Sequence, residues 1–231
     1  MVWQWRNKRG RPILTGVLLL VTGAYALSFV GIYGQPHPWT SASQWIYANV
    51  EPGALILSEQ WDDALPVSMT FDGEYRRRSE YRDEQLTWLT GTGSKDDVSK
   101  LESNLKSLAE AEFLTLVSNR TYGVVPRLPE LYPLASQYYQ LLFDGALGYE
   151  AVAVFGRFPN LAGVHLKPDT FGWPRLRPPA LVAEYLDGVT GLTLGRADES
   201  FTVYDQPLTI IFKNTEGMTA EEMLPLFELG G

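Results

Sequence analysis

The most constraining feature of the sequence is an uncharged apolar run at residues 13–33, ILTGVLLLVTGAYALSFVGIY. An α-helix rises 1.5 Å per residue, so about 21 residues span roughly 30 Å, the thickness of the hydrocarbon core of a bilayer. The run therefore predicts a single transmembrane helix and makes the lipid bilayer the first expected partner of the chain.

Charges on the two sides of this run predict its orientation. The segment WRNKRGRP, residues 5–12, is basic, and the next basic residue after the run is Arg76. By the positive-inside rule, residues 1–12 are expected to be a cytoplasmic tail, and residues 34–231 an extracytoplasmic domain, periplasmic in a bacterium with two membranes.

A cleavable signal peptide is the competing interpretation of the same run. Ala24, Tyr25 and Ala26 resemble a small-x-small cleavage site. The apolar run continues for about seven residues beyond them, which is longer than a signal peptide needs. We therefore expect an uncleaved anchor, and with either alternative the body of the protein is extracytoplasmic.

Composition excludes several classes of function. The 231-residue chain has a formal net charge of −8, which disfavours nucleic-acid binding because phosphate recognition needs clustered Lys and Arg. It has no cysteine, which excludes disulfides, thiolate catalysis and zinc-thiolate sites. Its two histidines, His37 and His165, are far apart. No cofactor, metal ligand or catalytic residue is therefore expected from the sequence.

Three apolar runs predict buried strands, namely ALILSEQ at 54–60, FLTLVSNR at 113–120 and YEAVAVF at 149–155. Helical segments separate them, and strands alternating with helices are typical of an α/β layered domain. We expect a Rossmann-like arrangement in topology only, since neither G-x-G-x-x-G nor G-x-x-x-x-G-K-[ST] occurs.

The clearest helix of this domain is expected within residues 93–112. Val98, Leu101, Leu105 and Leu108 recur at helical spacing and predict a face that packs on the sheet. A second helix is expected within 128–148, a short one within 40–53, and a short strand at 67–71.

Two regions lack such patterns. Residues 72–85 are highly charged and predict solvated surface. Residues 156–196 are rich in Pro and Gly, with one expected helix at 180–188. A loop of this length either binds a partner or wraps the surface of its own domain, and both alternatives stay open.

The C-terminal part predicts a β-hairpin. Residues 201–204 and 208–213 have strand character, and Asp205 lies in the connection, where Asp favours turns. Asp198 and Glu199 stand at the entry to the first of these strands, where acids accept hydrogen bonds from backbone or Arg. A structural role is therefore expected for these acids.

The best candidates for a ligand or partner site follow the first predicted strand. Trp61, Asp62 and Asp63 lie at its carboxyl end, the position where α/β proteins place ligands. Trp173 is the fourth candidate, because an exposed tryptophan can stack on a sugar, as could Trp61 and Trp88.

Three ordered segments carry a resemblance to a known family. They are SASQWIYANVEPGALILSEQWDDALP at 41–66, LVSNRTYGVVPRLPELYPLASQYYQLLFDGALGYE at 116–150 and ADESFTVYDQPLTIIFKN at 197–214. Together they resemble the extracytoplasmic C-terminal part, with the last membrane helix, of family-39-like bacterial membrane glycosyltransferases. Gln206 departs from this pattern, because the family would have His in that turn.

The resemblance implies a fold and a location but no activity. Those enzymes bind a lipid-phosphate sugar within a bundle of membrane helices, and their catalytic acid lies in an early external loop. One expected membrane helix provides no counterpart for that loop, so no catalytic residue carries over.

Two functional hypotheses follow. The first is a non-catalytic single-span subunit of a larger membrane complex, with an extracytoplasmic docking or scaffold domain that contacts other integral membrane subunits. The second is a component of a split lipid-phosphate-sugar-dependent glycosyltransferase. A free-standing sugar-binding module is the third alternative.

Overall fold

The computed structural model describes residues 10–89, 97–172 and 176–228. Most of the predicted cytoplasmic tail, residues 1–9, and the candidate Trp173 lie outside the described residues. The helices are α1 (Gly10–Val30), α2 (Pro38–Asn49), α3 (Val98–Glu110), α4 (Pro133–Phe143), α5 (Ala180–Gly188) and α6 (Ala220–Met223), with 3-10 turns at Gly31–Gly34, Arg78–Glu80, Val125–Arg127 and Leu224–Leu226 and a π-helix at Phe201–Asp205. The strands are β1 (Leu55–Ser58), β2 (Met69–Phe71), β3 (Glu74–Arg76), β4 (Arg82–Gln85), β5 (Phe113–Leu116), β6 (Tyr149–Phe155), β7 (Asn160–Leu161), β8 (Val164–Pro168), β9 (Gly191–Leu194) and β10 (Thr209–Asn214).

A mixed five-stranded sheet forms the centre of the described body, in the order β4-β1-β5-β10-β6. Strand β1 pairs in parallel with both β4 and β5, whereas β10 is antiparallel to both of its neighbours, β5 and β6. The α/β class is confirmed. The Rossmann-like arrangement is not, because an antiparallel strand lies between β5 and β6.

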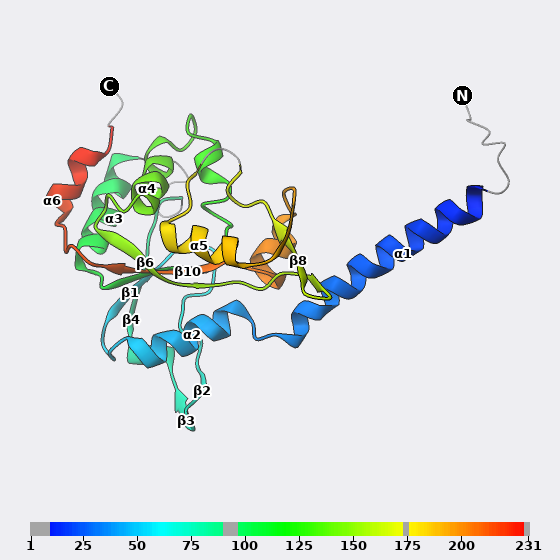
Figure 1. Ribbon diagram of the computed structural model, residues 1–231. Helices are drawn as coiled ribbons and strands as arrows, with labels where there is room; N and C mark the ends of the chain where they lie inside the picture. Colours follow the sequence, from blue (N-terminus) through cyan, green and yellow to red (C-terminus); the bar gives the residue numbers. More distant parts are fainter. Residues whose placement is uncertain (1–9, 90–96, 173–175, 229–231) are drawn as a thin grey trace.

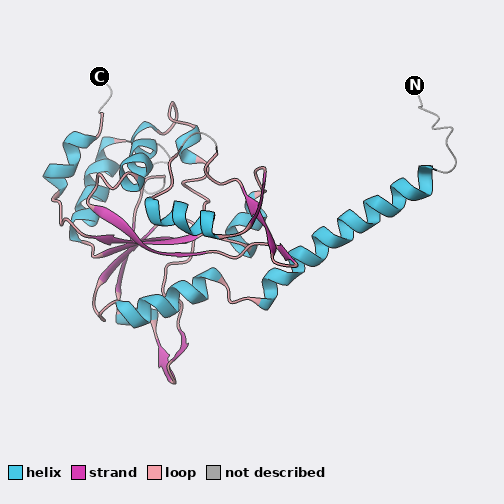
Figure 2. Cartoon of the chain, in the orientation of Figure 1, coloured by secondary structure: helices cyan, strands magenta, loops and turns pink. Residues whose placement is uncertain are grey.

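The sheet is the middle of three layers (Figures 1 and 2). Leu57 and Leu114 point to one face, where α3 and α4 pack, and Ile56 and Phe113 point to the other face, which α2 covers. Strands buried on both faces read as continuous apolar runs, and β1 and β5 are buried at every position. These two predicted strands are therefore confirmed.

Helix α3 begins where Asp97 accepts the backbone N–H of Lys100 at 3.0 Å, an N-cap that satisfies one of the free amides of the first turn. Leu101, Leu105 and Leu108 are fully buried in the core, as predicted. The assignment of Val98 to the same face is wrong, since its side chain is 49% exposed. Val98 is the first residue of the helix.

Most of the charged segment 72–85 is exposed, as predicted, but Tyr81 is buried and the segment is not only surface loop. It contains β3, which forms a hairpin with β2, and β4, which is an edge strand of the main sheet with all four residues exposed. The predicted strand at 67–71 is thus β2, and it belongs to this hairpin rather than to the main sheet. The pairing of β4 depends on the distant strand β1, which local composition cannot report.

The region 156–196 is more ordered than its composition predicts. It contains a small sheet in the order β7-β8-β9, with β8 antiparallel to β7 and parallel to β9. The helix expected at 180–188 is confirmed as α5.

The predicted C-terminal β-hairpin is wrong. Residues 208–213 do form a strand, β10, but the segment expected as its partner is the π-helix Phe201–Asp205. Asp198 starts this helix by accepting the backbone N–H and the hydroxyl of Ser200, at 3.0 and 2.6 Å. Aromatic and β-branched residues gave the segment its strand character, and tertiary contacts described below override that preference.

Helix α1 projects from the body as a single long rod (Figure 1). Within the described residues it is the one helix long and apolar enough to cross a membrane, and a signal sequence near an N-terminus would have the same properties. The predicted apolar helix is therefore confirmed, starting at Gly10 and passing after Val30 into a 3-10 turn.

Candidate functional site

Two loops meet at one edge of the main sheet. One follows β1 and carries Glu59, Trp61 and Asp62, and the other follows β5 and carries Ser118 and Arg120. Because β1 and β5 are adjacent and parallel, their carboxyl ends bring these loops together. The predicted location of the site is therefore where polar side chains gather.

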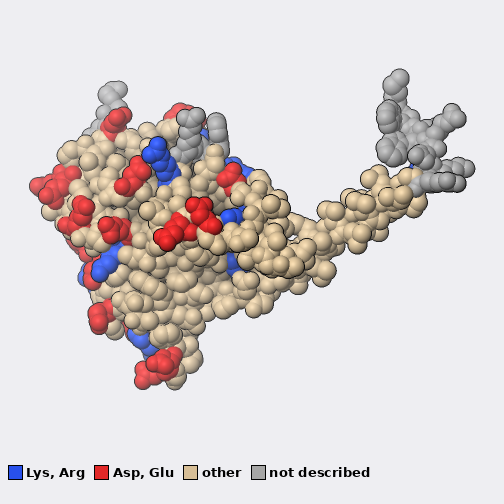
Figure 3. Space-filling view, viewed as in Figure 1, with Lys and Arg blue, Asp and Glu red and all other residues tan. Residues whose placement is uncertain are grey.

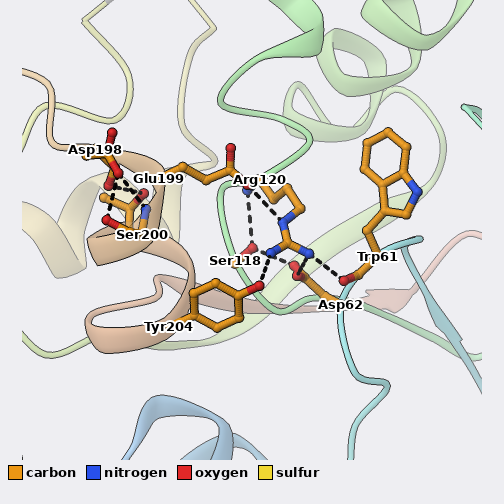
Figure 4. Close-up of polar contacts among 9 residues, drawn as sticks. Trp61, Asp62, Ser118, Arg120, Asp198, Glu199, Ser200 and Tyr204 are labelled. Carbon is orange, nitrogen blue, oxygen red and sulfur yellow. Dashed lines mark hydrogen bonds and ion pairs between the residues drawn. The ribbon is translucent and has the colours of Figure 1, made fainter.

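Arg120 is the centre of this strand-end site (Figure 4). Its Nη1 lies 3.0 Å from Asp62 Oδ1 and donates to the backbone oxygen of Trp61 at 2.5 Å. Its Nε donates to Glu199 Oε1 at 3.1 Å, and its Nη2 donates to the Tyr204 hydroxyl at 2.6 Å. Each nitrogen of the guanidinium thus has a partner among the described residues.

Asp62 is likewise satisfied. Ser118 Oγ donates to Asp62 Oδ2 at 2.5 Å, and the same Ser118 oxygen accepts the backbone N–H of Arg120 at 3.2 Å. Burial raises the pKa of Asp62, and the Ser118 hydrogen bond and the Arg120 charge oppose this. Burial disfavours the charge of Arg120, but its bonds to Tyr204, Asp62 and Glu199 outweigh this and raise its pKa. The pair is an ion pair with both partners held in place.

Glu59 lies behind this network in an aromatic environment. Thr121 Oγ1 donates to its Oε2, while Oε1 has no hydrogen-bond partner among the described residues. Burial raises the pKa of Glu59 to about 7, and the hydroxyls of Thr121, Tyr139 and Tyr138 reduce that shift. A buried carboxyl group of this kind binds a proton near neutral pH.

A second polar cluster, the joint, lies where α1 meets the body. Arg157 Nε donates to the backbone oxygen of Asp205 at 2.6 Å, and its Nη1 donates to those of Ile32 and Gln35, each at 3.3 Å. Burial lowers the pKa of Arg157, which is 7% exposed. Tyr33 donates its hydroxyl to Asp205 Oδ1 at 2.7 Å.

His37 completes the joint. Its Nδ1 accepts the backbone N–H of Trp39 at 3.2 Å and so caps α2. Its Nε2 therefore carries the proton and donates to the backbone oxygen of Tyr204 at 2.9 Å. Burial lowers the pKa of His37, which favours this neutral form.

The structure separates the predicted candidates. Trp61 is 56% exposed and has a φ of 73°, Asp62 is half-buried in the network, and Asp63 is exposed beside them. Trp88 is buried and stacks on Tyr138 with ring centroids 4.7 Å apart, which excludes it as a surface sugar platform.

The C-terminal acids have the bonding roles expected of them. Asp198 caps the turn before the π-helix, and its carboxylate points away from Arg120 in Figure 4. Glu199 accepts from Arg120, and Asp205 accepts from Tyr33. The expected turn between two strands is wrong for Asp205, because it ends a helix instead.

Sequence reasoning missed Arg120, Ser118 and Glu59 at the strand-end site and Arg157 at the joint. Position after a buried strand was a usable signal for Glu59, which directly follows β1, and for Ser118, which lies two residues after β5. Arg157 gave no such signal, because its three acceptors are backbone oxygens from two distant segments.

The chemistry available here is limited. Among the described residues, no group of three or more His, Cys, Asp or Glu side chains could hold a metal ion. Comparison with known proteins found no matching family model, no matching curated protein and no matching solved structure. The arrangement is that of a closed polar network that presents an exposed tryptophan.

Proposed function

We propose that this chain is a non-catalytic single-span subunit of a larger membrane complex, and that its body is an extracytoplasmic docking domain. Helix α1 would anchor it, with the basic residues before the helix in the cytoplasm. The closed state of the Arg120 network supports a docking role over catalysis, since its charged groups already bond one another. The resemblance to a glycosyltransferase tail agrees with this location.

The observation that carries the docking role is the conformation of Trp61. A positive φ is unfavourable for a bulky residue and persists where surrounding structure imposes it. Here Arg120 holds the carbonyl oxygen of Trp61, and the indole points away from the network (Figure 4). An exposed tryptophan whose backbone is held beside charged residues is the kind of residue that dominates protein interfaces.

The joint supports the same role. Hydrogen bonds from Arg157 and Tyr33 connect the turn that follows α1 to the body. The ring of Phe29 in α1 also contacts the ring of Phe201 edge-on, with the ring centroids 5.2 Å apart. A domain fixed to its membrane helix presents Trp61 at a constant height and direction, which suits a subunit that docks to neighbours in the same membrane.

Native copurification tests the proposal. We expect partner chains to copurify with the parent protein from mildly solubilised membranes, and Trp61→Ala to lower their yield at least about five-fold, on the scale of one interface hot spot. Tyr75→Ala is the matched control, because Tyr75 is 62% exposed on the β2–β3 hairpin. Equal yields of partner chains with both variants would show that Trp61 is not the docking residue. If no chain copurifies with the parent protein, the proposal is refuted.

A component of a split lipid-phosphate-sugar-dependent glycosyltransferase is the second candidate. The observation that favours it is the exposed pair of Trp61 and Asp63, since an indole and a carboxylate together suit the apolar face and the hydroxyls of a sugar. Identification of the copurifying chains by mass spectrometry separates the two. A multispan transferase supports this candidate, and an unrelated complex supports the first.

Retention of the anchor is tested separately. We expect the intact mass of the protein extracted from membranes to include residues 13–33. A mature chain that begins near Leu27 would show that the apolar helix is a cleaved signal and would contradict the single-span proposal.

A further inference from the structure

We propose that one face of the small β7-β8-β9 sheet rests in the lipid surface beside α1, so that the body touches the membrane through a sheet as well as through its anchor. This inference rests on the proposed anchoring role of α1. It adds a second membrane-contacting element and names its ligand as the acyl and headgroup region of phospholipids.

The strand register places apolar side chains together. Residues opposite one another in a sheet share a face, and so do residues two apart along a strand. Leu161 pairs with Val164, Leu166 with Leu192, and Pro168 with Leu194. One face therefore carries only apolar side chains, and we call it the apolar sheet face: Leu161, Val164, Leu166, Pro168, Leu192 and Leu194.

On the opposite face, two side chains of β8 bond to neighbouring parts of the chain. Lys167 Nζ donates to the backbone oxygens of Leu186 and Val189, at 2.6 and 2.9 Å, near the end of α5. His165 Nδ1 lies 3.1 Å from the backbone oxygen of Thr190. Lys167 on the polar side thus bonds to the body while most of the apolar side is exposed, which reverses the usual orientation of a surface sheet.

Within the described residues, four of the six side chains of the apolar sheet face are exposed. Leu161, Val164, Leu192 and Leu194 are all exposed, the most exposed being Leu192 at 60%. Clustered exposed apolar side chains on one element mark a contact with another molecule or with a membrane.

The position of the sheet along α1 points to lipid. The backbone oxygen of Asn160 in β7 lies 3.7 Å from the Cβ position of Gly31, just after the end of α1. A groove joins Tyr25 of α1 to Leu166, Pro168 and Leu194 of the apolar sheet face. Tyr25 lies six residues before Gly31, so the sheet extends back along α1 by about 9 Å.

The length of α1 determines the depth in the membrane at which the small sheet would lie. Its 21 residues are about as many as a bilayer core requires. A spanning α1 therefore places Tyr25 within the membrane or at its interface, and the strands beside Tyr25 lie at the same depth. Interfacial elements bury apolar side chains about 5–10 Å into this zone.

The surroundings of the sheet agree with a lipid contact. In Figure 3, the visible acidic and basic side chains gather on the body, while α1 beyond its first turn, which contains Arg11, carries uncharged residues. The exposed Arg196 lines the same groove as Tyr25, where a guanidinium can reach headgroup phosphates. The apolar surface of the anchor is thus followed by the apolar sheet face, with Arg196 in the groove that joins them.

Depth-dependent fluorescence quenching tests the inference, because the chain has no natural cysteine. Leu192→Cys, Thr193→Cys and Leu131→Cys would each be labelled with an environment-sensitive fluorophore in the full chain. The proteins would be reconstituted at low density in phosphatidylcholine–phosphatidylglycerol vesicles that contain a lipid with a nitroxide near the top of its acyl chain. Leu131 is the matched control, because it is as exposed as Leu192, at 60%.

We expect quenching at Leu192 to exceed that at Leu131 at least about three-fold. Quenching at Thr193, which lies on the opposite face of β9, should be about half that at Leu192 or less. Equal quenching at Leu192 and Leu131, or at Leu192 and Thr193, would overturn the proposal. A blue-shifted but unquenched label at Leu192 would also overturn it, because a second copy of the chain would then cover the face.

Leu19→Cys distinguishes this inference from the proposed anchor. Leu19 lies in the middle of α1, so its label should be quenched by a nitroxide placed deep in the acyl chain. Deep quenching at Leu19 without quenching at Leu192 leaves the anchor intact and refutes the sheet contact. Loss of both signals refutes the anchor and the sheet contact together.

Discussion

Arg120 at the strand-end site and Arg157 at the joint are held by the same five-residue π-helix in opposite ways. Arg120 is bonded by two carboxylates, those of Asp62 and Glu199, as well as by the hydroxyl of Tyr204. Arg157 donates to backbone oxygens alone in its recorded bonds, including that of Asp205. One guanidinium is neutralised by charge, and the other is solvated by peptide dipoles.

The difference teaches how one short helix can serve two purposes. Tyr204 gives its hydroxyl to Arg120 and its carbonyl to His37, so the two clusters share a residue. A π-helix leaves backbone groups without their usual intrahelical partners, and such turns are frequent at functional sites. Here these carbonyls accept the bonds that fix α1 to the body, while the side chains complete the network beneath Trp61.

The largest expected effect comes from breaking the joint. Arg157→Met keeps the buried aliphatic stem but leaves three carbonyl oxygens without their donor. We expect it to reduce the free energy of unfolding by about 3 kcal/mol or more, because each buried acceptor left without a donor costs about 1–3 kcal/mol. Chemical denaturation of the full chain in detergent micelles measures this, with the exposed Arg177→Met as control. A loss no larger than the control would show that the joint is not a stabilising cluster.

The ionisation of Glu59 makes the free energy of unfolding depend on pH. Its pKa is about 7 in the folded protein and 4.5 in the unfolded chain, so the folded state binds more protons between these values. Its contribution is therefore complete below about pH 4.5 and is lost as pH rises toward 7, with a total of about 3 kcal/mol. Glu59→Gln keeps the neutral shape and should raise the free energy of unfolding at pH 8 by up to that amount.

The contribution of His37 in the joint to stability changes with pH in the opposite direction to that of Glu59. The pKa of His37 is lowered, chiefly by burial, so its stabilising contribution is present above about pH 6.5 and is lost as pH falls. Thermal unfolding of the parent and Glu59→Gln proteins across pH 5–8 separates the contribution of Glu59 from that of His37. If their difference does not grow with pH, Glu59 is not a buried acid.

The two carboxylates of Arg120 should differ in importance. Asp62 is half-buried and bonded to Ser118 and Arg120, so we expect Asp62→Asn to cost about 1–3 kcal/mol. Glu199 has a side chain 58% exposed, and exposed ion pairs contribute less than about 1 kcal/mol. Denaturation of both variants at low and high salt measures the contrast, and a salt-sensitive Asp62 would mean that the pair is open to solvent.

The smallest effect is expected at Asp205. Asp205→Asn keeps an acceptor for the Tyr33 hydroxyl, and the carbonyl that binds Arg157 belongs to the backbone and is unaffected. We expect the melting temperature to change by less than about 2 °C, and membrane assembly to be unchanged. Loss of assembly with normal melting would indicate that the carboxylate itself contacts a partner.

Local patterns predicted the parts of this fold that depend on local chemistry. Continuous apolar runs identified β1 and β5, and helical spacing identified the buried face of α3 from Leu101 to Leu108. The long apolar run identified α1. For β1, β5 and α3 the order of residues indicates which side chains are buried, and for α1 it indicates an apolar segment whose large side chains are mostly exposed.

The remaining features depend on contacts between distant segments. Residues 201–205 have strand chemistry but bind Tyr33 and Arg120, and Tyr33 is 172 positions away from Asp205. The sequence prediction named Trp61 and Asp62 at the sheet edge where the Arg120 network lies, but it did not name Arg120. No local pattern distinguishes an arginine that crosses between loops from one that faces solvent.

The exposed edge strand β4 affects how copies of the protein would interact within one membrane. Copies of a protein confined to a membrane, as proposed here, collide edge-on in two dimensions far more often than they would in solution. An unpaired strand edge invites such copies to join their sheets, and charged side chains oppose this. Arg82, Asp83 and Glu84 occupy that edge and are all exposed. The charges on β4 thus oppose edge-to-edge pairing of copies, so contacts with neighbouring proteins are expected at other surfaces.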